Sequence, residues 1–214
     1  MKILAIDTAL GACSVAILDN DQVLAHRFEV MQRGHAEALA PMIEAAMQDA
    51  ALNFAGLERL GVTTGPGTFT GQRVGLAFMR ALRIALDIPL VGVTTLSVMA
   101  HQAMVESGIE KGVALHDARR DEVYLEICGT TASPPRLLSF PDAVANIAEI
   151  RTTIVLAGTA AARATSELRN AVLSHVLQPD ALWVAKQCLV VAAPDGPPRP
   201  LYLRPPDAKL PERA

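Results

Sequence analysis

The chain has 214 residues, of which 51% are hydrophobic, 19% are charged and only 4% are aromatic, and its formal net charge is −3. This length and apolar content allow a large core built mainly from Ala, Leu, Val and Ile, in one domain or two small ones. No apolar run reaches the roughly 18 residues of a membrane span, and Asp7 interrupts the apolar start that a signal peptide requires. We therefore expect a soluble, cytoplasmic protein that does not associate with membranes.

The distribution of charged residues, cysteines and histidines argues against a protein that binds nucleic acid alone and against a metalloprotein. The densest basic group is the pair Arg119-Arg120, whereas a protein that holds nucleic acid alone usually carries a basic stripe. We therefore expect any RNA to be held by another protein. Cys13, Cys128 and Cys188 form no CxxC pair, and the five histidines show no HxxxH or HExxH spacing. The sequence predicts no metal site, and it predicts cysteines that serve as small core residues in a reducing compartment.

The first half of the chain passes from strands to alternating helices and strands. Short apolar or β-branched runs predict strands at residues 2–7, 14–18, 23–30, 60–64 and 90–93. Helical spacing predicts helices at residues 35–52, at 74–86 after a cap at Thr70, and from a cap at 94–97 to about 107. Pro41 lies inside the first helix and must kink it or stand in its opening turn. The order is β-β-β-α-β-α-β-α.

The second half resembles a worn copy of the first. Strands are predicted at residues 112–117, 122–127, 134–138, 153–157 and 175–177, and helices at 142–150, 160–171 and 179–191. Both halves open with a strand that ends in an acid, Asp7 and Asp117. Two β-β-β-α-β-α lobes, residues 1–108 and 109–214, predict an α/β protein of the actin/hexokinase/Hsp70-like (ASKHA) fold with a degenerate second lobe. Half of the 14 prolines lie between Pro194 and Ala214, which predicts an extended tail.

A glycine-rich loop between the fourth strand and the second helix is the main candidate for a ligand site. Strand, glycine loop and helix N-terminus together can hold an anion, because free N–H groups converge there and the helix dipole favours negative charge. A tight turn that binds nothing would show the same pattern, and the Lys-Ser/Thr pair of a P-loop is missing. The residues of this phosphate-loop-like, vestigial site are Asp7, Thr8, Gly65, Gly67, Thr68 and Gly71.

The corresponding part of the second lobe lacks the glycines of a nucleotide clasp. Asp117 is followed by Ala118-Arg119-Arg120, and the glycine pair expected around an adenosine is reduced to Gly158. We interpret Asp117 as a structural turn acid rather than a catalytic one. The sequence therefore predicts half a clasp, which disfavours the alternative of a stand-alone ATPase or sugar-type kinase. A metallopeptidase would need paired histidines.

The first two helices carry more apolar surface than one core requires. In the second helix the polar side chains from Gln72 to Asp87 occupy only about 100° of the circumference, and in the first they form a narrower stripe. An ordinary surface helix needs one apolar stripe, so a helical interface with another protein is favoured over two helices buried inside one core. The expected interface residues are Leu39, Met42, Ile43, Ala46, Met47, Gly75, Ala77, Phe78, Met79 and Leu82.

Several segments in order resemble the TsaB (YeaZ) family. They are Ile3–Thr8, His35–Glu37, Gly65–Gly71 with Arg73, Asp117–Arg120 and Tyr202–Arg204. Ala36 and Thr68 stand where the family usually has serines. The resemblance implies an essential, non-catalytic subunit of the bacterial machinery that makes threonylcarbamoyladenosine beside the anticodon of tRNAs.

The same resemblance implies the partners. The homologous subunit TsaD would carry the metal and perform the transfer in a heterodimer with this chain, and TsaE would supply ATPase function through that complex. The chain alone would form a homodimer and would meet tRNA only indirectly. It would have no cofactor of its own, with ATP or ADP bound only at the interface of the complex.

Overall fold

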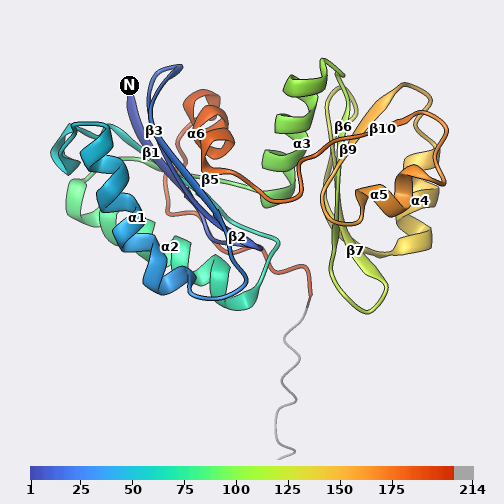
Figure 1. Cartoon of the computed structure of the whole chain (residues 1–214), viewed down its shortest axis with the longest axis horizontal. Helices are drawn as coiled ribbons and strands as arrows, with labels where there is room; N and C mark the ends of the chain where they lie inside the picture. The colour runs from blue at the N-terminus through green and yellow to red at the C-terminus, as the bar shows by residue number, and fades with distance from the viewer. Residues whose placement is uncertain (205–214) are drawn as a thin grey trace, which may run out of the picture.

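Two five-stranded sheets stand side by side in the computed structural model, which describes residues 1–204 (Figure 1). The first sheet has the order β3-β2-β1-β4-β5 and the second the order β10-β9-β6-β7-β8. The strands are β1 Lys2–Asp7, β2 Ala12–Asp19, β3 Gln22–Val30, β4 Arg59–Thr63, β5 Leu90–Val93, β6 Gly112–Asp117, β7 Glu122–Cys128, β8 Ser133–Ser139, β9 Ile154–Ala157 and β10 Ala171–Leu173.

The two sheets repeat one topology. In each, the first three strands pair antiparallel in succession, the fourth strand pairs parallel with the first, and the fifth pairs parallel with the fourth. The third strand of each sheet forms one edge, and the last strand forms the other. This repetition confirms the predicted pair of β-β-β-α-β-α lobes and the ASKHA-like arrangement.

Helices cover both faces of the first sheet. Side chains alternate along β1, so Leu4 and Ile6 enter the core under α1 (His35–Asp49) and α2 (Phe69–Leu86), whereas Ile3 and Ala5 enter the core under α6 (Ala181–Val190). Both faces are buried completely at these positions. A sheet buried on both faces explains why β1 shows a continuous apolar run instead of alternation.

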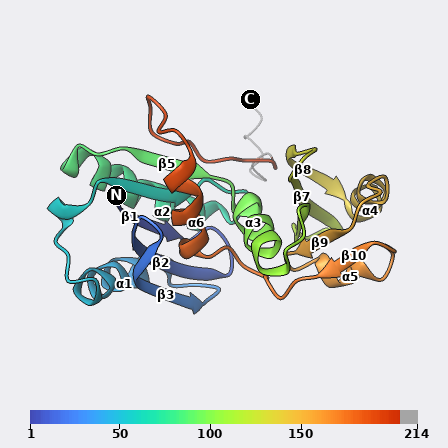
Figure 2. The ribbon, with the colours of Figure 1, turned by 90° about the horizontal axis from the view of Figure 1, so that it is seen from above.

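The last helix of each lobe packs on the sheet of the other lobe. Helix α3 (Thr95–Ser107) follows the first sheet in the chain, but it packs against β6, β7 and β9. Helix α6 follows the second sheet, but it packs against β1, β2 and β4. Seen from above, α3 and α6 lie together between the sheets (Figure 2). The strands of the first sheet all lie before residue 108 in the chain, and those of the second sheet all lie after it. Helix α6 belongs to the second half of the sequence but packs on the first sheet.

The outer face of the second sheet is covered by α4 (Phe140–Ala148) and α5 (Ala161–Thr165). Two predictions in this lobe are wrong. The last strand is Ala171–Leu173 rather than residues 175–177, and α5 is much shorter than residues 160–171. Beyond the end of α5 at Thr165, the Asn170 side-chain amide donates to the carbonyls of Ile150 and Thr152 in the loop between α4 and β9.

The C-terminal segment has no helix or strand between Val191 and Arg204, as the prolines predict. The rest of the predicted tail, residues 205–214, lies outside the described residues. None of the helices within residues 1–204 has both the length and the hydropathy needed to cross a bilayer.

Candidate functional site: the glycine loop, the second helix and the C-terminal strap

The glycine loop leads from β4 into α2, as predicted, but Thr70 is not the helix cap. Helix α2 begins at Phe69, and the hydroxyl oxygen of Thr68 accepts a hydrogen bond from the Gly71 N–H over 3.1 Å. Thr70 lies inside the first turn. A threonine cap usually accepts from the N–H two or three residues further on. Thr68 therefore could have been recognised as a candidate cap from the sequence.

The loop glycines are approached closely by the turn between β1 and β2. A Cβ on Gly67 would lie 2.3 Å from the Ala9 carbonyl oxygen, and one on Gly71 would lie 2.2 Å from the Thr8 carbonyl oxygen. The Thr68 N–H donates to the Ala9 carbonyl over 2.8 Å. Backbone carbonyls of the turn between β1 and β2 therefore pack directly against the loop glycines, and the Thr68 and Gly71 N–H groups already have acceptors within the chain.

Asp7 lies at the same junction and is completely buried. Its Oδ1 accepts hydrogen bonds from the Thr63 hydroxyl (2.5 Å) and the Ala9 N–H (3.3 Å), whereas its Oδ2 has no partner. Burial raises the pKa of this carboxyl from 3.8 to about 7, against the lowering effect of those two hydrogen bonds. Thr8, also buried, donates to the Gly71 carbonyl over 2.7 Å. The structure thus brings the six predicted loop residues together in a packed junction that ties β1, β4 and α2.

The second lobe shows the structural turn inferred from its sequence. Asp117 Oδ1 accepts a hydrogen bond from the Arg119 N–H over 2.8 Å. Arg119, Arg120 and Asp121 all have positive φ angles, between 57° and 66°. This is the left-handed region that side-chain-bearing residues rarely adopt in succession. Gly158 serves packing too, because a Cβ there would lie 2.5 Å from the Leu115 carbonyl oxygen.

The histidines and acids that the structure describes do not gather into a ligand set. Within residues 1–204 no three His, Cys, Asp or Glu side chains stand close enough to hold a metal ion. His26 contacts Asp180 over 2.8 Å, and the His35 ring nitrogen lies 3.1 Å from the Leu10 carbonyl oxygen. Burial lowers the pKa of His116 to about 4, so this ring is neutral at pH 7.

Most of the expected interface residues face the protein's own core, which corrects that prediction. Buried within the first lobe are Leu39, Ile43, Ala46, Met47, Gly75 and Met79. Met42, Phe78 and Leu82 are partly buried against the same core, and Ala77 alone of the ten is exposed. The polar arc of α2 is narrow because the helix has two apolar sides, one that packs in the protein's own core and one that is more exposed. Helical periodicity alone did not separate these two sides.

One side of α2 carries an apolar stripe of exposed and half-buried side chains. Its members recur at spacings of one and three residues, and they are Val74, Ala77, Phe78, Ala81, Ile84 and Ala85. Ile84 is 78% exposed. We call these six residues the α2 stripe. Beside α2 lies α1 (Figure 1). Ala38, Met42 and Ala45 of α1 are partly buried and line a hollow with β3.

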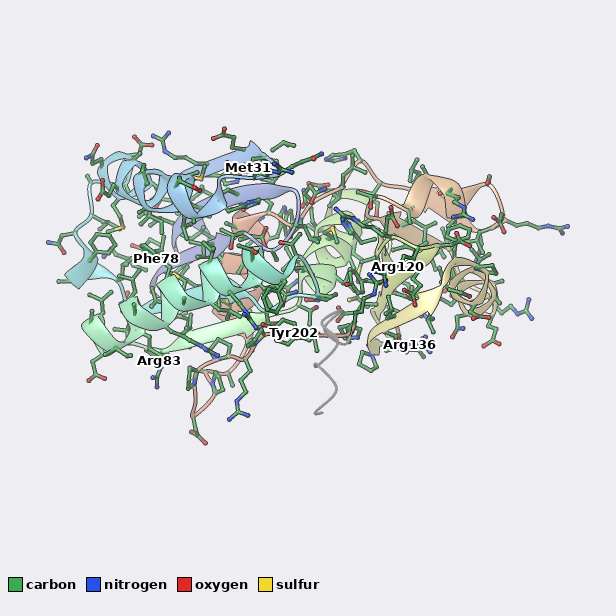
Figure 3. The ribbon with its side chains drawn as sticks, turned by 90° about the horizontal axis from the view of Figure 1, so that it is seen from below. Met31, Phe78, Arg83, Arg120, Arg136 and Tyr202 are labelled. Atoms are coloured by element: carbon green, nitrogen blue, oxygen red, sulfur yellow. The ribbon has the colours of Figure 1, made fainter. Side chains whose placement is uncertain are left out.

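Residues 196–204 form a segment whose course over the molecule could not be predicted from the sequence, and we call them the strap. The strap lies along α2 from its C-terminal towards its N-terminal end. Pro198 O accepts hydrogen bonds from the Arg80 guanidinium, the Leu201 N–H donates to the Thr64 carbonyl over 2.8 Å, and Tyr202 accepts from Arg73 Nε over 2.8 Å. Arg204 then forms an ion pair with Glu122 of the second lobe. Figure 3 shows Tyr202 at one end of α2 and Arg83 towards the other.

Comparisons with known proteins agree with this architecture. A sequence model of the family described as "TsaD: tRNA N6-adenosine threonylcarbamoyltransferase" matches residues 23–133. The chain is 39% identical over 124 residues to the tRNA threonylcarbamoyladenosine biosynthesis protein TsaB of Escherichia coli K12, a match covering 58% of this chain and 53% of that protein. The chain thus spans about half the length of the curated relatives it matches.

Solved structures match over nearly the whole chain. A Pseudomonas aeruginosa protein described as similar to peptidase YEAZ superposes with a TM-score of 0.78 and 27% identity, covering 95% of this chain and 99% of that one. Component A of the (R)-2-hydroxyglutaryl-CoA dehydratase of Acidaminococcus fermentans matches with a TM-score of 0.53 and 13% identity, covering 88% and 97%. This second likeness concerns the fold alone.

The repeated lobes and the loop between β4 and α2 define an actin-like, two-lobed α/β protein whose glycine loop is closed by its own chain. The chain belongs to the TsaD family and, within it, to the TsaB (YeaZ) group.

Proposed function

We propose that this chain acts in forming threonylcarbamoyladenosine in tRNA, as a non-catalytic subunit that binds and activates a TsaD-type catalytic subunit. The observation that carries this proposal is the closed loop. Carbonyls of Thr8 and Ala9 pack against the loop glycines, the Thr68 and Gly71 N–H groups already have acceptors within the chain, and the second-lobe turn carries Arg119 and Arg120 in place of glycines. A protein of this family without an accessible phosphate loop is better suited to support a catalytic homologue than to act alone.

The α2 stripe supports docking to such a partner. Each large apolar side chain left in water forgoes roughly 1.5–3 kcal/mol of burial, and Ile84 and Phe78 lie on one continuous face with the small residues Ala77 and Ala81. Small side chains allow a second helix to approach closely. A TsaD-type partner, being homologous, would present a similar helix pair, and a second copy of this chain could cover the same stripe in a symmetric homodimer.

In this proposal TsaD carries the metal and the transfer chemistry, and TsaE acts through the assembled pair. This chain needs no cofactor of its own, and ATP or ADP would bind only where the two subunits meet.

The test is to mix the purified chain with its cognate TsaD, to measure co-elution, and to measure threonylcarbamoyl transfer to tRNA with each subunit omitted in turn. We expect a stable complex and transfer that depends on both proteins. Transfer by TsaD at the same rate without this chain, or the absence of any complex, would contradict the proposal.

A further inference from the structure

A row of arginines lies where the strap runs along α2. Helix α2 contributes Arg73, Arg80 and Arg83, and the strap contributes Arg199 and Arg204. Neither residues 69–86 nor residues 196–204 contain an Asp or Glu. In a chain with a net charge of −3, these two adjacent segments therefore form a locally cationic edge beside the α2 stripe. The sequence concealed it, because the two segments are more than a hundred residues apart in the chain.

Part of this edge has no anionic partner among residues 1–204. Arg80, Arg83 and Arg199 line one hollow together with Ile84, Gly196 and Pro197. Arg80 donates to the Pro198 carbonyl, and Arg204 is paired with Glu122, whereas neither Arg83 nor Arg199 forms an ion pair within residues 1–204. Guanidinium groups that converge in this way fit phosphate oxygens, which they can bind through two N–H groups at once.

Two aromatic rings stand at the other end of the row. Phe69 is 55% exposed and Tyr202 is 44% exposed, and their ring centroids lie 6.0 Å apart at an interplanar angle of 29°. The Arg73 guanidinium carbon lies 3.5 Å from the centre of the Phe69 ring and holds the pair in place. Exposed, ordered rings beside arginines are the arrangement on which unpaired bases stack. An acidic protein would use the arginines but would leave the rings without a role.

From this arrangement we infer that the strap and the basic edge of α2 bind unpaired RNA directly. Phosphates lie along Arg80, Arg83 and Arg199, and a base stacks on the exposed side of the Phe69–Tyr202 pair. This inference goes beyond the proposed function, in which the chain serves another subunit. It also replaces the expectation that RNA is met only through a partner.

The first test measures binding of a fluorescein-labelled RNA hairpin with an unpaired loop, by anisotropy at several salt concentrations. The full chain is used alone and with cognate TsaD. The double variant Arg83→Gln/Arg199→Gln should bind about tenfold more weakly at low salt, and the slope of log affinity against log salt should fall by about two, because two phosphate contacts are lost. Arg151→Gln/Arg169→Gln, exposed arginines of the second lobe, is the matched control and should bind as the unmodified chain does.

The second test separates stacking from charge. Tyr202→Phe keeps the ring and should retain most of the affinity, whereas Tyr202→Leu should lose about fivefold or more, since stacking contributes roughly 1–3 kcal/mol per base. Equal losses in both arginine pairs, an unchanged salt slope, or competition by polyglutamate as strong as by unlabelled hairpin would overturn the inference. Such a result would leave the proposed function intact, because complex formation with TsaD is measured without RNA.

Discussion

The hydroxyl of Thr8 donates a hydrogen bond to the carbonyl oxygen of Gly71 across 2.7 Å, between residues 63 positions apart in the chain. The contact is buried, and it fixes the turn after β1 against the first turn of α2. In this protein the glycine loop is thus a place where the chain packs on itself. The same glycine spacing in the sequence is equally compatible with a phosphate site, because both demand close approach to the backbone.

Adding one methyl group at Gly71 tests this packing. A Cβ there would lie 2.2 Å from the Thr8 carbonyl oxygen and 2.6 Å from the Thr68 hydroxyl oxygen, which caps the helix, so there is little room to relax. We expect Gly71→Ala to lower the free energy of unfolding by about 1–3 kcal/mol, measured by urea denaturation. Gly196→Ala is the control, since a Cβ there meets nothing within 4 Å. Equal stability of the two variants would show that the junction is looser than described.

Asp7 should make stability depend on pH in an unusual direction. Burial raises its pKa from 3.8 to about 7 in the folded protein, so between about pH 4 and pH 7 the folded state binds a proton that the unfolded state has lost. The contribution of Asp7 to stability therefore falls as pH rises through this window, by up to about 4 kcal/mol at 1.36 kcal/mol per pKa unit.

The variant Asp7→Asn, which cannot ionise, isolates this effect. We expect it to be more stable than the unmodified chain at pH 8, with the difference shrinking towards pH 4, in chemical denaturation at matched ionic strength. Comparing the two proteins cancels the similar contribution of Glu126, whose pKa burial also raises to about 7. A difference that does not change with pH would contradict the raised pKa of Asp7.

The order of strands and helices in the two lobes could be predicted from the sequence better than the way in which the helices pack. Apolar runs such as Ile3–Ile6 and turn residues gave nine of the ten strands in the right order. The strand Ala171–Leu173 was missed because it is a three-residue edge strand with two exposed side chains, Val172 and Leu173, and therefore has no burial pattern. The crosswise packing of α3 and α6 depends on contacts between distant segments, which local periodicity does not encode.

The same limit applies to the candidate site. Spacing located the glycine loop, but only the structure shows that the Ala9 carbonyl packs against Gly67 and accepts from the Thr68 N–H. On α2, periodicity indicated more apolar surface than one core requires, but it did not indicate which residues face the core. Met79 is completely buried whereas Ile84 is exposed, although both were apolar members of one helix. The sequence identified Tyr202–Arg204 only as a family-like segment of an extended tail, and it could not predict that the strap lies along α2, because these nine residues form no helix or strand.

Exchange of α3 and α6 between the lobes predicts that neither half folds alone. Residues 1–108 lack α6, which leaves Ile3 and Ala5 of β1 uncovered on one face of the sheet. We expect this fragment to show no cooperative thermal unfolding, and to regain it when mixed with residues 109–214. Circular dichroism during heating provides the measurement. Cooperative unfolding of the isolated fragment at the temperature of the intact chain would contradict this account of the fold.

Because the chain packs on its own glycine loop, we expect nucleotide neither to stabilise the isolated chain nor to be hydrolysed by it. Millimolar ATP with Mg²⁺ should leave its melting temperature unchanged and should produce no hydrolysis above background. Scanning fluorimetry and a phosphate-release assay measure the two quantities. Hydrolysis that persists on repurification but disappears in Asp7→Ala would favour the alternative of a stand-alone ATPase or kinase.

The most direct test of the central claim places one charge on the α2 stripe and measures binding to cognate TsaD by sedimentation. Ile84→Arg should abolish or weaken the complex at least tenfold and lower threonylcarbamoyl transfer in parallel, because an unpaired charge would be buried at the seam. Val190→Arg is the matched control, since Val190 is 85% exposed at the end of α6, whereas Ile84 is 78% exposed. Both variants should fold normally, and the control should bind TsaD fully. Full binding and full transfer by a well-folded Ile84→Arg protein would contradict the claim that the α2 stripe is the partner surface.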